Sequence, residues 1–135
     1  MWTYLNGEFI PKKDVRISPF DRGFLFGDSV YEVIPSYDNQ PFLFNEHLER
    51  LKRSLSVTKI PIPDYLNHFN LLIMDLIQRN KYPNQAIYIQ ITRGEDPERA
   101  HVSSSTTTPT LFMSSTELEI NPYRLDPNKN YIIRI

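Results

Sequence analysis

The clearest periodic pattern in the chain is a helical one, between residues 64 and 80. Apolar residues recur there at spacings of three and four, which places them on one face of a helix: Leu66, Phe69, Leu72, Ile73, Leu76 and Ile77. Asn80-Lys81-Tyr82-Pro83 ends this helix, and the β-branched run QAIYIQIT at 85–92 predicts a strand directly after it. The fold must therefore bury one face of a helix against a sheet.

Two hairpins are expected before that helix. Residues 2–10 alternate around the Asn-Gly pair at 6–7, the dipeptide that most readily supplies the positive φ angles of a type I′ turn. The run SVYEVIPSY at 29–37 is expected to pair with PFLF at 41–44 across a polar turn. Pro35 cannot donate a backbone hydrogen bond, so it indicates an edge or a bulge.

A further helix is expected after the second hairpin. Asn45 can cap it, and Leu48, Leu51 and Leu55 form one apolar stripe along it. Arg50 lies off that stripe and is free to point elsewhere. Together with the other elements this indicates an α+β fold class, with hairpins and a mainly antiparallel sheet on which two helices pack.

A long polar stretch separates the strand at 85–92 from another strand predicted at 110–114 (TLFMS). The stretch is long for a plain connection between strands. It is therefore either a functional loop or a mobile one.

Length and composition indicate one globular domain. The chain has 135 residues, of which 40% are hydrophobic and 23% charged, and its net charge is −1. That charge offers no bulk attraction to nucleic acid or to acidic membranes, and no run of eighteen apolar residues predicts a membrane span. The absence of cysteine excludes disulfides, thiolate zinc sites and cysteine nucleophiles. We expect a cytoplasmic protein.

The densest group of glycines and charges lies at residues 21–34 (DRGFLFGDSVYEVI), directly before and within the first long strand. Glycine there permits a tight backbone path or the close approach of another group. Arg22 stands between two carboxylates, Asp21 and Asp28, and such an arginine is either a structural clamp or an anion site. The residues alone leave both a structural turn and a functional loop open.

The same stretch resembles the signature near the start of class IV (fold type IV) pyridoxal-5′-phosphate aminotransferases. In that family, D-R-G-[apolar]-x-[aromatic]-G-D-[small]-[apolar]-[aromatic]-E leads into a strand beside the cofactor. The resemblance implies the small N-terminal domain of a fold type IV enzyme, with pyridoxal 5′-phosphate as cofactor. It also implies amino acid and 2-oxo acid substrates and a homodimer.

Residues 44–51 (FNEHLERL) resemble the family's H-[apolar]-x-R-L helix start. The resemblance assigns Arg50 to the cofactor phosphate, a role that suits the rigid, permanently charged fork of a guanidinium group. The alternative is a solvated helix arginine near Glu46 and Glu49. His47 and His68 are interpreted as structural or surface residues.

Residues 91–101 (ITRGEDPERAH) resemble the T-R-G…R-x-H loop of D-amino acid aminotransferases. The resemblance implies that Arg99 and His101 reach across a dimer interface and bind the substrate α-carboxylate together with Tyr31. The alternative for His101 is a surface imidazole. Branched-chain aminotransferases and aminodeoxychorismate lyases share the first two motifs, but they generally bind their substrates' carboxylates with other groups.

The lysine that forms a Schiff base with the cofactor in this family cannot be placed in the chain. None of the six lysines has the family's D-x-K context after a strand: Lys12, Lys13, Lys52, Lys59, Lys81 and Lys129. The catalytic lysine is expected beyond Ile135. The expected layout is therefore a small domain at 1–119, a linker at 120–129, and at 130–135 the first strand of a missing C-terminal domain.

The expected function is that of the N-terminal part of a D-amino acid transaminase, which converts D-alanine and 2-oxoglutarate into pyruvate and D-glutamate. A branched-chain aminotransferase or an aminodeoxychorismate lyase of the same family is the alternative. The chain is either a fragment of an active enzyme or a stand-alone remnant, and by itself we expect it to be inactive. An alternative of another class is a non-catalytic fragment or dimerisation module.

Overall fold

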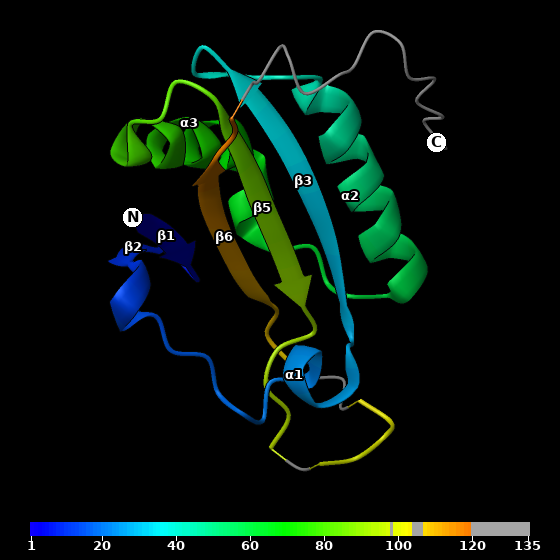
Figure 1. Ribbon diagram of the computed structural model, residues 1–135. Coiled ribbons are helices and arrows are strands. Elements are labelled where there is room, and N and C mark those ends of the chain that lie inside the picture. The colour runs from blue at the N-terminus through cyan, green and yellow to red at the C-terminus, as the bar shows by residue number, and fades with distance from the viewer. Residues whose placement is uncertain (98, 104–106, 120–135) are drawn as a thin grey trace, which may run out of the picture.

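The computed structural model describes residues 1–97, 99–103 and 107–119 of the chain. These residues form a six-stranded sheet with helices packed on it (Figure 1), which confirms the α+β expectation. The linker expected at 120–129 and the strand expected at 130–135 lie outside the described residues.

The sheet is antiparallel at every pairing between its strands. In the order β2-β1-β6-β5-β3-β4, its strands are β1 Trp2–Leu5, β2 Glu8–Pro11, β3 Ser29–Tyr37, β4 Gln40–Pro41, β5 Gln85–Thr92 and β6 Thr110–Glu117. The first hairpin turns at Asn6 and Gly7, whose φ angles are both positive, 46° and 108°. The predicted hairpin is thereby confirmed.

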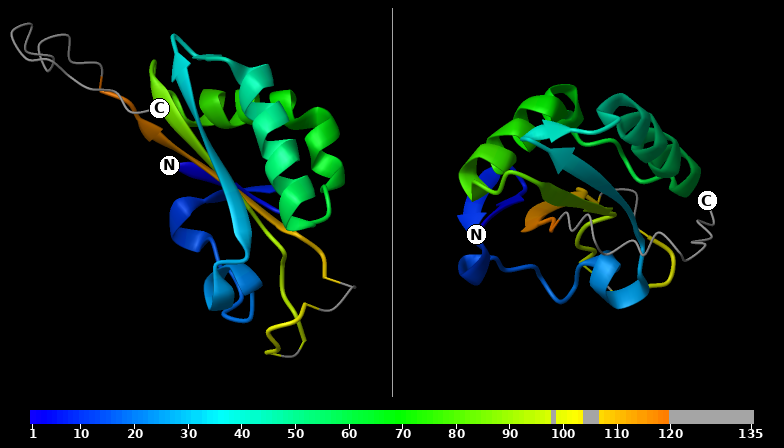
Figure 2. Two further views of the ribbon diagram at one scale, coloured as in Figure 1. Left: turned by 90° about the vertical axis from the view of Figure 1, so that its right-hand side faces the viewer. Right: turned by 45° about the horizontal axis from the view of Figure 1, so that its top comes forward.

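Two helices, α2 Phe44–Thr58 and α3 Phe69–Asn80, cover one face of the sheet (Figure 2). A short helix, α1 Arg22–Phe26, lies near the end of the sheet where β3 begins, and two 3-10 helices span Lys12–Asp14 and Asp64–His68. The core lies between α2, α3 and the sheet, and its most deeply buried members include Leu51, Leu55, Ile73, Leu76, Ile77, Ile87, Ile89, Ile91, Leu111 and Met113.

Two local predictions around residues 41–45 are wrong. The second strand of the hairpin ends at Pro41, and Phe44 belongs to α2 instead. Leu43 adopts a left-handed conformation (φ 49°) that turns the chain, so that Phe44 packs against the core. Helix α2 therefore starts one residue before the expected cap Asn45, and no side chain caps it.

The face of the sheet opposite α2 and α3 carries a second set of side chains. Alternation along β3 turns Val30, Glu32 and Ile34 toward the helices and leaves Tyr31 and Val33 on the open face, where they are 66% and 41% exposed. This open face positions Tyr31 beside the neighbouring strand β5. Among the described helices, none has the length and apolarity needed to cross a membrane.

Candidate functional site

A buried carboxylate anchors the first turns of α2 to the sheet. Glu32 is only 3% exposed, and its two oxygens accept hydrogen bonds from Arg50 Nε at 2.6 Å and Arg50 Nη2 at 2.5 Å. His47 Nδ1 lies 2.9 Å from Glu32 Oε2. His47 and Arg50 can reach the same carboxylate because residues three apart share one helix face.

Glu32 and Arg50 each stabilise the charged form of the other. Burial by itself would raise the pKa of Glu32, but the hydrogen bonds from Arg50 and His47 outweigh it, so the pKa lies below its ordinary value. The hydrogen bond with Glu32 likewise raises the pKa of Arg50. Both groups are therefore charged at neutral pH. The partner of Arg50 is Glu32, whereas the sequence suggested Glu46 or Glu49 as neighbours.

Arg50 remains open on its other side, since its side chain is 55% exposed. Its contacts with Glu32 use Nε and Nη2, so they leave the two N–H donors of Nη1 available. A shallow hollow at the edge of β3 is lined by Tyr31, Glu32, Val33, Arg50 and Ser54. The structure thus brings two of the predicted site residues, Tyr31 and Arg50, to one hollow.

Tyr31 stacks on Tyr88 of β5, with their ring centroids 6.0 Å apart. Burial raises the pKa of Tyr88, and the proximity of Tyr31 adds to that effect. Tyr31 therefore packs against the neutral ring of Tyr88, while its own ring is largely exposed.

The other two predicted site residues, Arg99 and His101, meet on the ring of Phe26 in α1. The guanidinium carbon of Arg99 lies 5.3 Å from the ring centroid, and the His101 ring lies at 5.5 Å. Both residues are exposed. Within one chain the structure therefore forms two groups, Tyr31 with Arg50 and Arg99 with His101.

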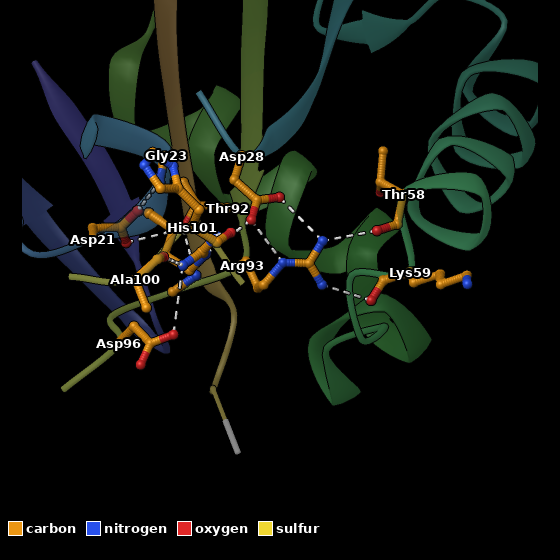
Figure 3. Close-up of polar contacts among 12 residues, drawn as sticks. Asp21, Gly23, Asp28, Thr58, Lys59, Thr92, Arg93, Asp96, Ala100 and His101 are labelled. Carbon is orange, nitrogen blue, oxygen red and sulfur yellow. Dashed lines mark hydrogen bonds and ion pairs between the residues drawn. The ribbon is translucent and has the colours of Figure 1, made fainter. Parts of the chain in front are cut away.

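Asp28 joins the first and third sequence motifs through two arginines (Figure 3). Arg93 donates from Nε to Asp28 Oδ2 at 2.7 Å, and Arg22 donates from Nε to the same oxygen at 3.0 Å. Because the hydrogen bonds from Arg93 and Arg22 outweigh the opposing effect of burial, they lower the pKa of Asp28. The carboxylate is charged and bridges two cations.

The same two motifs also interlock through small residues. Asp21 Oδ1 accepts from the backbone N–H of Gly23 at 2.7 Å, which caps α1, while its Oδ2 accepts from Thr92 Oγ1 at 2.9 Å. A Cβ on Gly23 would lie 2.4 Å from Thr92 Cγ2, so only glycine fits without a shift. Asp21 and Gly23 therefore have a structural role in this turn.

Sequence reasoning missed Glu32 and His47 as members of the cluster around Arg50. A signal for Glu32 existed, because it shares the alternation of Val30 and Ile34 on the buried face of β3. A carboxylate at a buried strand position needs a cationic or hydrogen-bonding partner. The nearest candidates in the following helix were His47 and Arg50. His68, in contrast, is exposed.

The family is decided by comparison with known proteins. Residues 29–134 match the family described as amino-transferase class IV, and this match covers more than half of the chain. The chain belongs to the class IV aminotransferases. The resemblance drawn from the sequence motifs is thereby confirmed.

Relatives of this class IV aminotransferase chain include the D-alanine aminotransferase of Staphylococcus epidermidis (strain ATCC 35984), with 35% identity over 121 residues. That match covers 90% of the chain and 43% of the relative, so the chain spans less than half the length of that curated relative.

Solved structures show the same fold. The branched-chain amino acid aminotransferase from Escherichia coli has a TM-score of 0.79 at 20% identity, over 87% of this chain and 41% of the other. The 4-amino-4-deoxychorismate lyase of Pseudomonas aeruginosa has a TM-score of 0.74 at 21% identity, over 90% of this chain and 42% of the other.

Proposed function

We propose that this chain is the N-terminal part of a pyridoxal-phosphate-dependent D-amino acid transaminase, which transfers the amino group of D-alanine to 2-oxoglutarate. The observation that carries the proposal is the meeting of Arg99 and His101 on Phe26, because it gathers two cationic or donor groups that can bind a carboxylate. The D-alanine aminotransferase relative, which matches 90% of the chain, supports the choice of the D-amino acid subgroup.

The residues of this chain fit the phosphate end of the cofactor. Glu32 holds the Arg50 guanidinium in one orientation, yet the available Nη1 donors and the exposure of Arg50 leave a face for a dianion. When bound, pyridoxal phosphate supplies an electron sink for the amino acid and carries its amino group. Glu32 would hold Arg50 in the orientation in which it binds the phosphate, and His47 would support the same carboxylate.

The other end of the cofactor requires a lysine, and we propose that a segment beyond Ile135 supplies it. Lys52 is ion-paired with Glu49 at 2.9 Å. Lys59 and Lys81 each follow a helix as its left-handed C-cap. Among the residues that the structure describes, no lysine lines the hollow that holds Tyr31 and Arg50. This distribution agrees with an active site completed by a second domain.

The substrate carboxylate would be bound by Tyr31, Arg99 and His101. Tyr31 offers a phenolic O–H from an exposed position on β3, and Arg99 supplies a permanent positive charge. Within one chain, Arg99 and His101 lie on Phe26 while Tyr31 stacks on Tyr88. As the resemblance to D-amino acid aminotransferases implies, we propose that one subunit supplies Tyr31 and the other supplies Arg99 and His101. This proposal therefore requires a homodimer.

Competing substrates test the proposed reaction. The full-length gene product, loaded with pyridoxal phosphate, is assayed with D-alanine and with L-leucine against 2-oxoglutarate, and separately with aminodeoxychorismate. The proposal predicts that kcat/KM for D-alanine exceeds the value for L-leucine by at least roughly a hundredfold, or about 2.7 kcal/mol of transition-state discrimination. Preference for L-leucine indicates a branched-chain aminotransferase, and turnover of aminodeoxychorismate indicates the lyase. No turnover of any substrate indicates a non-catalytic protein.

Two substitutions in the full-length protein test the residue assignments separately. Arg50→Gln should weaken pyridoxal phosphate binding about ten- to a hundredfold, the scale of one hydrogen-bonded charge. Arg99→Gln should raise KM for D-alanine by a similar factor and leave cofactor affinity unchanged. Arg79→Gln is the matched control, because Arg79 is also ion-paired on a helix, with Asp75. Unchanged cofactor affinity in Arg50→Gln would remove the phosphate assignment.

A further inference from the structure

Arg22 is a buried arginine whose guanidinium group holds the backbone of the loop between β5 and β6. Its side chain is 4% exposed. Nη1 donates to the carbonyl oxygen of Ala100 at 2.7 Å, and Nη2 donates to the carbonyl oxygen of His101 at 3.0 Å. Asp96, on the same loop, lies 3.6 Å from Nη1 (Figure 3 shows the loop residues). One side chain of α1 thus fixes three points of the loop.

Phe26, one helical turn later on α1, contacts the side chains of the same loop. Its ring lies 5.3 Å from the guanidinium carbon of Arg99 and 5.5 Å from the ring of His101. The guanidinium carbon of Arg22 lies 4.8 Å from the same ring. Cations are attracted to the face of an aromatic ring within about 6 Å. Arg22 therefore holds the backbone of the loop, and Phe26 holds its two functional side chains.

Asp28 and Arg93 connect this arrangement to α2. Asp28 accepts from both arginines, and Arg93 Nη1 and Nη2 donate at 2.8 Å to the carbonyl oxygens of Lys59 and Thr58, at the end of α2 (Figure 3). Helix α2 carries Arg50. One continuous set of charge-assisted hydrogen bonds therefore runs from the loop of Arg99 and His101 to the helix of the proposed phosphate ligand.

The burial of Arg22 is costly unless all its polar atoms have partners, and apolar residues of similar volume often stabilise a fold as well or better. Loops without secondary structure are generally the more mobile parts of a protein. A planar fork that donates to two successive carbonyls and to a carboxylate fixes the course of such a loop, which a point-charge ammonium group cannot do. An arginine at position 22 is therefore better explained by its role in fixing the conformation of the loop than by a contribution to the stability of the fold.

We propose that Arg22 and Phe26 are positioning residues that hold the segment 99–101 in the arrangement that binds the substrate carboxylate. Asp28 and Arg93 link Arg22 to the end of α2 through their hydrogen bonds. The proposal rests on the function proposed above. It implies that weakening either contact raises KM for the amino acid while kcat and cofactor affinity stay near their wild-type values, because the reacting atoms and the phosphate site are not touched.

The test uses two variants of the full-length protein loaded with pyridoxal phosphate. Arg22→Lys keeps the charge but loses the fork, and Phe26→Leu keeps an apolar side chain but loses the aromatic face. Arg16→Lys is the control, because Arg16 Nη1 also donates to two carbonyl oxygens, but in an exposed segment away from the loop. KM is measured with whichever amino acid the wild-type protein turns over, and amide hydrogen exchange is measured for residues 99–103.

The expected result is a KM raised by roughly tenfold or more in both variants, with kcat changed less than about twofold, and faster exchange at 99–103. The control should show neither change. Unchanged KM and exchange in Phe26→Leu would overturn the proposal even if Arg22→Lys fails to fold. Loss of cofactor affinity together with kcat would also overturn it, since that outcome means a general defect in folding. If the wild-type protein turns over no amino acid, the proposed function fails, while hydrogen exchange still decides whether Arg22 and Phe26 hold the segment.

Discussion

Gly94 closes the base of the loop that carries Arg99 and His101, and replacing it with alanine should be unusually costly. A Cβ at this position would lie 1.8 Å from the carbonyl oxygen of Thr108 and 2.8 Å from its carbonyl carbon. Both are backbone atoms, so no rotation of a side chain relieves the overlap. Gly94 is also fixed on its own side, because its carbonyl oxygen accepts from the backbone N–H of Arg22 at 2.9 Å.

The expected loss in the free energy of unfolding has a conformational part and a steric part. Comparison with a second glycine, Gly7, separates them. Gly94 has a φ of 93°, and a left-handed conformation costs an L-residue about 1–2 kcal/mol. Gly7 has a similar φ of 108°, but a Cβ there meets nothing nearer than 3.7 Å. Gly7→Ala should therefore show the conformational part alone. The overlap with Thr108 adds an overpacking cost of about 1–3 kcal/mol, so Gly94→Ala should lose about 2–5 kcal/mol in all.

Equilibrium urea unfolding of the two variants and of the wild-type chain measures these losses as changes in midpoint at constant slope. Gly94→Ala is expected to lose at least about 1 kcal/mol more than Gly7→Ala. Equal losses in the two variants would mean that the chain does not close the loop at Gly94 and Thr108. A change of slope in one variant would instead show that unfolding is no longer two-state, and the comparison would then use a smaller perturbation.

Three further predictions concern the core and the charge network. Asp28→Asn should reduce the free energy of unfolding at neutral pH by roughly 2–4 kcal/mol. Because the pKa of Asp28 is lowered in the folded state, this difference is fully present above the unfolded pKa of about 3.9 and should disappear as the pH falls through the folded pKa; a constant difference down to low pH would contradict it. Gln85→Ala should cost about 2–4 kcal/mol, since it removes the side-chain donor to the carbonyl oxygens of Tyr82 and Ile77 and the acceptor of the buried Ser115 hydroxyl, and a loss below about 1 kcal/mol would exclude that role. Leu55→Ala should cost about 2–5 kcal/mol in chemical denaturation, because Leu55 is fully buried in the core.

Local sequence patterns predicted the elements whose conformation depends on near neighbours. The Asn-Gly pair at 6–7 gives the first hairpin, and strand β5 has the bounds read from the run at 85–92. The apolar stripe of residues 66–77 is buried as expected, except that Leu72 is only half-buried and residues 64–68 form a 3-10 turn. These signals are strong because periodicity and turn chemistry act over a few residues.

The errors lie where tertiary contacts decide the conformation. Phe44 has an aromatic, strand-like neighbourhood, but its packing against the core and the left-handed turn at Leu43 make it the first residue of α2. The partners of Arg22 at Ala100 and His101 lie 78 and 79 residues away in sequence. No spacing rule connects residues so distant, so the anchoring of the loop could be found only from the folded chain.

The sequence predicted only some of the residues of the candidate site. The motifs pointed to Tyr31, Arg50, Arg99 and His101, and the fold brings these residues into two groups. The motifs did not indicate that Glu32 would be the partner of Arg50, since that pairing depends on α2 packing on β3. The assignments of these residues to phosphate and substrate remain predictions for the experiments described above.

The most direct test of the central claim is the intact mass of the natively expressed gene product after treatment with pyridoxal phosphate and borohydride, because reduction traps lysine-bound cofactor as a stable adduct. One pyridoxyl group per chain is expected, mapped by peptide mass to a lysine beyond Ile135. A protein without a stoichiometric adduct, or an adduct on a lysine within residues 1–135, would contradict the proposal that this chain supplies the phosphate and substrate contacts of a pyridoxal-phosphate enzyme.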